Sequence, residues 1–396
     1  MRRMKIVPDI RFKGFEDGWK LSELGRLFIE RIENNPNAEM LSVTINDGII
    51  KASENGRFDN SNSNKSKYKS VKKGDIAYNS MRMWQGASGV SNFEGIVSPA
   101  YTVLCPVSGV NSVFFSYLFK TIDTIKKFRL HSQGMTKDTW NLKYPALSKI
   151  AVEYPLEECQ QLQVASYLQN IDLQISKLVK RIVKLRQLKS ACLISMFPQQ
   201  GETVPRIRFK GFDGEWNEQK AENIFRQFIE KNRPDLPVLS ATQDRGMVTR
   251  KAIGYDISHD KRNECTYKHI LPGQFVIHLR SFQGGFAHSD IEGIASPAYT
   301  VFEFRDKNQH NDIFWKYIFS SKSFIKQLEK ITYGIRDGRS ISFDEFKDMK
   351  FIIPCVKEQH QIASYFRNLD IQISEQEKRL EKLKQIKAAC LDKMFV

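Results

Sequence analysis

The sequence predicts an α+β fold in which one mixed α/β domain occurs twice, and a long helix follows each copy. The two long helices are expected to pair as an antiparallel coiled coil with pseudo-two-fold symmetry. Three observations predict this fold: a repeat of half the chain length, a heptad pattern late in each repeat, and a mixture of strand-like and helix-like runs before it. With 396 residues, the chain is long enough for several domains with separate cores.

The repeat is clearest in IVSPAYTV (96–103) and IASPAYTV (294–301), which start 198 positions apart (294 − 96). IRFKGFEDGW (10–19) returns as IRFKGFDGEW (207–216), and 19 of the 33 positions 165–197 are identical 198 residues later. Similarity at one long period indicates a tandem duplication. We expect SPAYTV itself to be scaffold, because Ser-Pro favours extended backbone and Tyr, Thr and Val favour strands.

Apolar residues spaced alternately by four and three predict a coiled-coil helix at the end of each repeat. Neither Gly nor Pro interrupts residues 160–197, and Pro198 ends the run. The predicted apolar seam comprises Leu168, Ile171, Ile175, Leu178, Ile182 and Leu185 in the first helix, and Phe366, Leu369, Ile373, Gln376, Leu380 and Leu383 in the second. The polar Gln376 either sets the register or is merely tolerated.

The two helices are natural partners for each other, because each has one seam to bury. A helix of roughly 35 residues is about 50 Å long. Two related units close most simply about a two-fold axis, and an axis perpendicular to the helices makes them antiparallel. We therefore expect globular domains at residues 1–155 and 199–354, held apart by spacer helices at 156–198 and 355–396.

The globular segments mix both kinds of secondary structure. Residues 275–279, 298–304 and 349–354 have the composition of strands. Residues 113–128 and 312–331 have the periodicity of amphipathic helices.

The charge indicates a polyanionic partner. The net charge is +16 and the pI is about 9.4, which suggests either nucleic acid or an acidic membrane surface. No apolar run approaches the ~20 residues of a membrane span. The 6 cysteines are scattered singly, which is typical of a reduced cytoplasm.

Two basic domains at a fixed separation suit a DNA duplex with two recognition elements. Half-sites on one face of B-DNA lie roughly 34–36 Å apart. The variable segments 46–70 and 243–269 differ between the copies. We therefore expect an asymmetric bipartite target.

Candidate DNA contacts lie in the segments that surround the repeated motifs. Base readout is predicted for Arg82, Trp84 and Gln85 in the first copy and for His278, Arg280 and Gln283 in the second. Loops after the amphipathic helices add Lys137, Arg336 and Arg339. Phosphate contacts are predicted for Lys65, Lys67, Lys69, Lys72 and Lys73. A plain surface role remains the alternative for each of these residues taken singly.

Catalytic and metal-binding motifs are not convincing in this sequence. No ATP-binding GxxxxGK[ST] loop is present. A nuclease pairing of Asp235 with Glu345 and Lys347 would join residues 110 positions apart (345 − 235) and has no counterpart in the first copy. Cys265 and His269 lack a second pair of metal ligands. We expect a protein that binds and does not catalyse, with no metal site.

In combination, these motifs resemble the specificity (S) subunits of type I restriction–modification enzymes. They are the IRFKGF opening with its Trp, the SPAYTV segment, and the pattern Pro354, Glu358-Gln359, Ile362-Ala363 at the start of the second helix. The first copy departs from this pattern, because Gln160 stands in place of the Glu. A first-turn Glu favours a helix start, so we expect the first helix to begin differently.

The resemblance implies two target-recognition domains that each read one half of a bipartite site. It implies two methyltransferase (M) subunits docked on the spacer helices and restriction–translocase (R) subunits outside them. S-adenosylmethionine, ATP and Mg²⁺ would belong to those partners, in a bacterial or archaeal cytoplasm. The alternatives are a stand-alone duplicated nucleic-acid-binding regulator and an enzyme with an unrecognised site.

Overall fold

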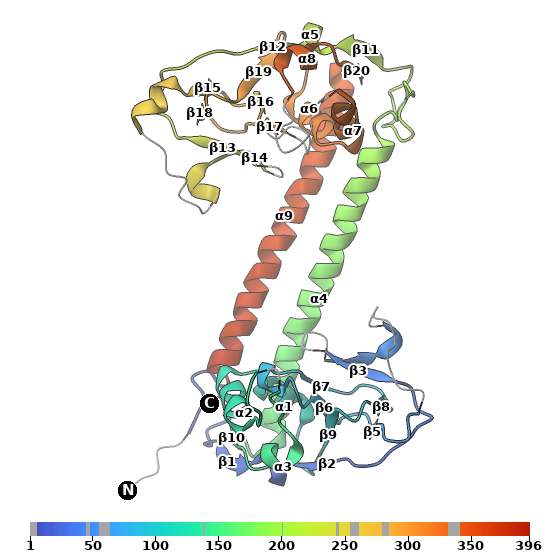
Figure 1. Ribbon diagram of the computed structural model, residues 1–396, viewed down its shortest axis with the longest axis vertical. Helices are drawn as coiled ribbons and strands as arrows, with labels where there is room; N and C mark the ends of the chain where they lie inside the picture. Colours follow the sequence, from blue (N-terminus) through green and yellow to red (C-terminus); the bar gives the residue numbers. More distant parts are fainter. Residues whose placement is uncertain are drawn as a thin grey trace. The chain divides into compact units, whose positions relative to one another are not determined.

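The computed structural model describes residues 6–44, 48–54, 64–137, 139–199, 201–242, 245–253, 261–278, 285–331 and 341–396 (Figure 1). The chain divides into two compact units. Unit 1 holds residues 1–179 and 378–396, and unit 2 holds residues 180–377. Over the described ranges, no helix combines the length and apolarity needed to cross a bilayer.

Unit 1 contains ten strands, three short α-helices and three 3-10 helices among its described residues. The strands are β1 (Lys20–Glu23), β2 (Phe28–Glu30), β3 (Leu41–Thr44), β4 (Gly48–Lys51), β5 (Lys69–Val71), β6 (Ile76–Asn79), β7 (Ser88–Val90), β8 (Gly95–Val97), β9 (Tyr101–Pro106) and β10 (Ala151–Tyr154). The α-helices are α1 (Ser112–Leu118), α2 (Ile122–His131) and α3 (Tyr144–Leu147), and the 3-10 helices are η1 (Leu24–Arg26), η2 (Ala52–Glu54) and η3 (Met83–Gln85).

Unit 2 repeats this plan. Its strands are β11 (Asn217–Lys220), β12 (Phe225–Gln227), β13 (Leu239–Thr242), β14 (Gly246–Thr249), β15 (Lys268–Ile270), β16 (Phe275–Ile277), β17 (Phe286–His288), β18 (Gly293–Ala295), β19 (Thr300–Phe304) and β20 (Lys350–Ile353). Its helices are α5 (Ala221–Ile224), α6 (Asp312–Phe319), α7 (Lys322–Ile331), α8 (Phe343–Lys347), η4 (Arg250–Ile253) and η5 (Lys261–Thr266).

The sheets of the two units have the same strand order. In unit 1, an antiparallel sheet β2-β9-β6-β7 accompanies the pairs β1-β10, β3-β4 and β5-β8. In unit 2, the sheet β12-β19-β16-β17 accompanies the pairs β11-β20, β13-β14 and β15-β18. The duplication seen in the sequence is therefore a duplication of topology.

The SPAYTV segments lie at the centre of these sheets. The turn Ser98–Ala100 leads into β9, which pairs with both β2 and β6. Its repeat in unit 2 leads into β19, which pairs with both β12 and β16. Val103 and Val301 are completely buried. The near-identity of the two stretches thus preserves a central strand in each unit.

Each predicted amphipathic helix proves to be two helices. Residues 113–128 were predicted as one helix, but α1 ends at Leu118 and α2 starts at Ile122. The Thr121 hydroxyl accepts a hydrogen bond from the Thr124 amide, so Thr121 is an N-cap. In unit 2, Ser321 accepts from the Phe324 amide between α6 and α7. Thr and Ser occur in helix interiors as well as at caps. The apolar periodicity alone therefore did not predict where the first helix ends and the second begins.

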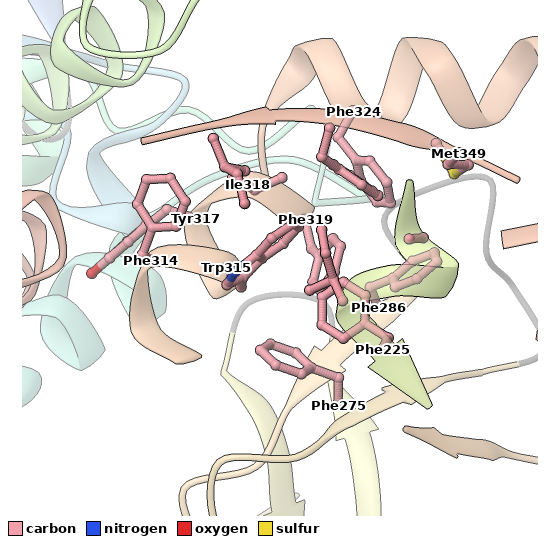
Figure 2. Packing of buried hydrophobic residues seen from close by; sticks show 14 of the residues in the cluster. Phe225, Phe275, Phe286, Phe314, Trp315, Tyr317, Ile318, Phe319, Phe324 and Met349 are labelled. Atoms are coloured by element: carbon pink, nitrogen blue, oxygen red, sulfur yellow. The ribbon is translucent and has the colours of Figure 1, made fainter. Parts of the chain in front are cut away.

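The core of unit 2 is aromatic (Figure 2). Phe225 is buried on β12 and packs edge-on against Trp315 and Phe302, with ring centroids 4.8 and 5.3 Å apart. Figure 2 shows the neighbouring Phe319 and Phe286 in the same cluster. Burying each such side chain contributes about 1.5–3 kcal/mol. This core holds the four-stranded sheet against α6 and α7.

Two long helices, each of 38 residues, pass through both units: α4 (Glu158–Ser195) and α9 (Val356–Lys393). Within unit 2, Lys189 pairs with Asp370 at 2.5 Å, and Arg186 pairs with Glu377 at 2.6 Å. As the residue number rises along α4, the residue number of its partner on α9 falls. Within unit 1, the last turns of α9 share a core cluster with the first turns of α4. In each unit the two helices are antiparallel, and the predicted fold class is confirmed.

The expectation that the first long helix begins differently is wrong. Helices α4 and α9 begin at equivalent positions of the repeat (356 − 158 = 198). Glu358 is not a helix cap: it is 1% exposed and forms two hydrogen bonds of 2.8 Å with the Arg208 guanidinium. Gln160, buried at the equivalent position of unit 1, is uncharged and cannot form such an ion pair.

Candidate nucleic-acid interface

Two segments that were predicted separately as DNA contacts come together in unit 1. The Leu142 amide donates to the Ser80 carbonyl oxygen at 2.8 Å, which joins the ends of the two segments. The rings of Trp84 and Trp140 meet edge-on, with centroids 5.4 Å apart. We call the surface around this pair the Trp84 surface. It comprises Met81, Arg82, Trp84, Gln85, Arg129, Leu130, Met135, Lys137 and Trp140.

The first part of this surface is a short helix anchored by one buried side chain. Met83 of η3 is completely buried, and Gly86 ends the helix with a φ of +78°, which favours glycine. The Asn79 side chain accepts a hydrogen bond from the Met81 amide at 3.0 Å. This arrangement leaves Arg82 and Gln85 exposed.

The second part comprises residues 132–137 and 139–141, whose two ends are joined by hydrogen bonds. Gln133 and Asn141 exchange backbone hydrogen bonds of 2.9 and 2.8 Å. At the turn, the Thr139 amide donates to the Thr136 carbonyl oxygen at 3.0 Å. Gly134 has a φ of +141°, and a Cβ there would lie 2.6 Å from the Thr139 carbonyl oxygen. The loop therefore needs glycine at this position, and it presents Met135 and Lys137 to solvent.

The Trp84 surface carries positive charge. The Arg129 guanidinium lies 6.0 Å from the centre of the Trp84 ring, in a cation–π arrangement. Among the described residues, Arg82, Arg129 and Lys137 have no ion pair with a carboxylate. The nearby acids Asp123 and Glu153 pair instead with Lys126 and Lys127, both at 2.9 Å.

The five lysines predicted to contact phosphate lie in β5 or within four residues of it. Lys69 pairs with Glu30 at 3.0 Å, and Lys72 pairs with Glu33 at 3.2 Å. For Lys65, Lys67 and Lys73 the described part of the chain shows no ion pair, and Lys67 and Lys73 are exposed. These three lysines are the better phosphate candidates, because no described carboxylate neutralises their charge.

In unit 2, the structure describes one of the predicted contacts. His278 follows β16 and is half-buried, and its ring centroid lies 6.2 Å from that of Tyr299. Burial lowers the pKa of His278, so its neutral form is favoured near neutral pH. Arg280, Gln283, Arg336 and Arg339 lie outside the described residues.

The predicted seam residues differ in burial along the helices. Leu168, Ile171, Leu178, Ile182, Phe366, Leu369 and Ile373 are buried, and Ile175, Leu185, Gln376, Leu380 and Leu383 are half-buried.

The residues considered for catalysis or for metal binding have structural partners. The Arg233 guanidinium donates two hydrogen bonds, of 3.0 and 2.9 Å, to the two carboxylate oxygens of Asp235, and these lower the pKa of Asp235. Glu345 belongs to the capping box at the start of α8 with Ser342. His269 lies between two carboxylates: its Nδ1 is 3.0 Å from an oxygen of Glu230, and its Nε2 is 2.9 Å from an oxygen of Glu292. In the described ranges, no group of three or more His, Cys, Asp or Glu is arranged to hold a metal ion.

Comparison with known proteins finds one family-model match over part of the chain and several similar folds. Residues 215–385 match the family model of the type I restriction modification DNA specificity domain. The S subunit of a type I restriction–modification system from M. genitalium has a TM-score of 0.59 at 14% sequence identity, with 99% of each chain covered. A second similar chain comes from a structure on the complex assembly and conformational transition of the type I restriction–modification system. Its TM-score is 0.50 at 15% sequence identity, with 97% of this chain and 99% of that chain covered. No curated protein sequence matches the chain.

Proposed function

We propose that the chain, of which residues 215–385 match the type I restriction modification DNA specificity domain, is a specificity protein that reads a bipartite, asymmetric site on double-stranded DNA for a multisubunit complex. In that complex it is the specificity and assembly subunit. Partner subunits carry out adenine methylation and DNA cleavage, and the chain itself directs them to the target.

One observation carries this proposal: the two units share one framework but differ where the candidate contacts lie. The strand order is the same in both units, and the central strands come from near-identical sequence. The segments 46–70 of unit 1 and 243–269 of unit 2, by contrast, differ in sequence, and Trp84 is replaced by Phe282, whereas Arg82 and Gln85 recur as Arg280 and Gln283. A common framework with different contact segments suits the reading of two different half-sites.

Exposed apolar side chains on α4 support a role in assembly. Within unit 1, α4 exposes Leu162, Leu173 and Val179, and within unit 2 it exposes Val183, Leu188 and Ile194. Each of these side chains is at least 43% exposed. On α9, Ile371 is the one large apolar side chain that is as exposed as these. A stand-alone regulator has no need for exposed apolar side chains along a long helix, so that alternative is not favoured.

We assign these side chains of α4 to the docking of two methyltransferase (M) subunits, to which restriction–translocase (R) subunits are added. S-adenosylmethionine, ATP and Mg²⁺ act in those partner subunits, and we assign no cofactor to this chain. The complex works in the cytoplasm of a bacterium or archaeon.

Co-expression with the methyltransferase subunit tests the assembly role. The wild-type chain should co-purify with M subunits in a ratio of about 1:2. Leu173→Glu combined with Val183→Glu should reduce this ratio, because it places charge on the apolar face. As a control, Gln174→Glu, on an exposed polar position of the same helix, should leave the ratio unchanged. Adenine methylation or DNA cleavage by the isolated chain would contradict the proposal.

A further inference from the structure

Met135 is the most exposed large apolar side chain of the described residues, at 101% of its reference accessible area. We propose that Met135 is an apolar base-reading side chain, which becomes buried against the bases of the half-site that unit 1 recognises. This inference rests on the proposed DNA-reading function and adds to it a specificity-determining residue that is not a hydrogen-bonding one.

The loop that carries Met135 is ordered by its own contacts. The exchanged hydrogen bonds of Gln133 and Asn141 close its base, and the Thr136–Thr139 turn closes its tip. Gly134 packs against Thr139, and Trp140 packs against Trp84. Met135 is thus presented to solvent from a closed loop, which reduces the entropy lost when a partner binds.

The apolar surface extends beyond one residue. Leu130, next to the Arg129 that lies over Trp84, is 82% exposed. Met81, whose carbonyl oxygen accepts a hydrogen bond from the Trp84 indole at 3.1 Å, is 48% exposed. Leu130 and Met81 are thus linked to the Trp84–Trp140 pair through Arg129 and through this hydrogen bond, and exposed apolar side chains on one surface mark interaction sites.

The surrounding charge identifies the partner as nucleic acid. Arg82 and Arg129 are the chain neighbours of Met81 and Leu130, and Lys137 is two residues from Met135; in the described part of the chain no carboxylate pairs with any of these cations. Such a set of cations attracts phosphates, and phosphates cannot bury a methionine. On DNA, an apolar side chain finds apolar contact only at the bases, either at a thymine methyl group or between base steps.

Lys137 provides a matched comparison, because it lies two residues from Met135 on the same exposed turn. A lysine on phosphate contributes equally to every DNA sequence and adds about one to the salt dependence of binding. An apolar contact to bases contributes only at the correct sequence and adds nothing to the salt dependence. The two substitutions should therefore weaken binding in different ways.

The experiment measures binding of the assembled complex to two duplexes by fluorescence anisotropy over a range of salt concentrations. One duplex carries the target found by methylation mapping, and the other carries a scrambled sequence. Met135→Ala should weaken binding to the target about tenfold, with no change on the scrambled duplex or in the salt dependence. Met135→Leu should retain most of the affinity, while Lys137→Ala should weaken binding to both duplexes and lower the salt dependence by about one.

Unchanged affinity of Met135→Ala for the target would overturn the inference, as would an equal loss on both duplexes. Loss of co-purifying M subunits with DNA binding intact would also overturn it, because the apolar surface would then be a protein interface. If the wild-type complex does not prefer its target to the scrambled duplex, the proposed function itself fails.

Discussion

Two carboxylates, Asp172 and Asp370, occupy the same position in the two copies of the repeat and make the same contacts. The Tyr117 hydroxyl donates to Asp172 at 2.7 Å, and Lys387 lies 2.5 Å from the other oxygen of this carboxylate. In unit 2, the Tyr317 hydroxyl donates to Asp370 at 2.7 Å, and Lys189 lies 2.5 Å from the other oxygen of that carboxylate. Each aspartate thus joins one short helix, α1 or α6, to both long helices.

These bridges depend on partial burial. Burial, together with the hydrogen bond to the aspartate, raises the pKa of Tyr117 and of Tyr317 well above the ordinary value. The tyrosine of each bridge therefore stays protonated and remains a donor at any ordinary pH. The Lys387 and Lys189 ammonium groups also lie over the rings of Tyr117 and Tyr317, at 5.7 and 5.1 Å.

Substitution at one bridge should destabilise the unit that contains it. Asp172→Asn weakens a charge-assisted hydrogen bond and leaves Lys387 without its partner, so unit 1 should lose about 1–3 kcal/mol of its free energy of unfolding. Hydrogen exchange measured by mass spectrometry should show faster exchange in α1 and little change in α6. Asp370→Asn should give the reverse result, and Glu375→Gln, at an exposed position of α9, should alter neither. Equal effects of Asp172→Asn on both short helices would contradict the account.

At the scale of the elements, the end of each long helix completes a globular core. Phe395, which follows α9, packs against Trp19 and Phe114 in unit 1, with centroids 6.1 and 5.2 Å apart. Phe197, which follows α4, packs against Trp216 and Phe314 in unit 2, at 6.2 and 5.6 Å. Since α9 follows unit 2 in the sequence, the core of unit 1 needs residues from the other end of the chain.

Truncation of these aromatic side chains tests that dependence. Phe395→Ala should destabilise unit 1 by about 3–5 kcal/mol through lost packing and the cavity left behind. Limited proteolysis should then cut first within residues 6–155 and spare residues 217–353. Phe197→Ala should shift the sensitivity to residues 217–353. A Phe395→Ala chain as resistant as wild type would show that the aromatic contact contributes little to the core.

We expect Glu303, on the central strand β19, to make the stability of unit 2 depend on pH. Burial alone would raise the pKa of Glu303, but hydrogen bonds from Gln274 at 3.1 Å and Arg226 at 2.6 Å outweigh it, so this pKa lies below its usual value. A carboxyl whose pKa is lower in the folded state stabilises that state above its unfolded pKa of about 4.3. This contribution is lost as the pH falls through the folded pKa.

Unfolding in urea at a series of pH values measures this effect. For the wild type, the midpoint at which residues 217–353 become protease-sensitive should fall as the pH drops below about 4.3. Glu303→Gln should be less stable at neutral pH and lose less stability in acid, because its side chain does not titrate. Parallel pH profiles of the two proteins would exclude Glu303 as the source.

Periodicity and repetition predicted the long helices, their antiparallel pairing and the strand of the SPAYTV segment. These features follow from local spacing and from symmetry, so they are readable in the sequence. The break at Thr121 was missed, because a Thr is compatible with a helix interior and with a cap. The Trp84 surface was found only in part: no local pattern reveals that Trp84 and Trp140 touch, or that Met135 and Leu130 remain exposed while Met83 is buried.

At the scale of the whole molecule, one chain carries two versions of one framework, which we propose to bind DNA. The net charge of +16 suits a polyanionic partner, and the different contact segments of the two units predict two different half-sites. Each unit should then determine its own half of the motif, and the same partner subunits should modify whatever site the pair selects.

Methylation mapping in cells that carry the wild-type or a domain-exchanged chain tests this most directly. The wild type should direct adenine methylation at a split, asymmetric motif. Replacing residues 1–155 by the corresponding segment of another specificity protein should change one half of that motif and leave the other half intact. A change in both halves, or a continuous motif without a central gap, would contradict the account.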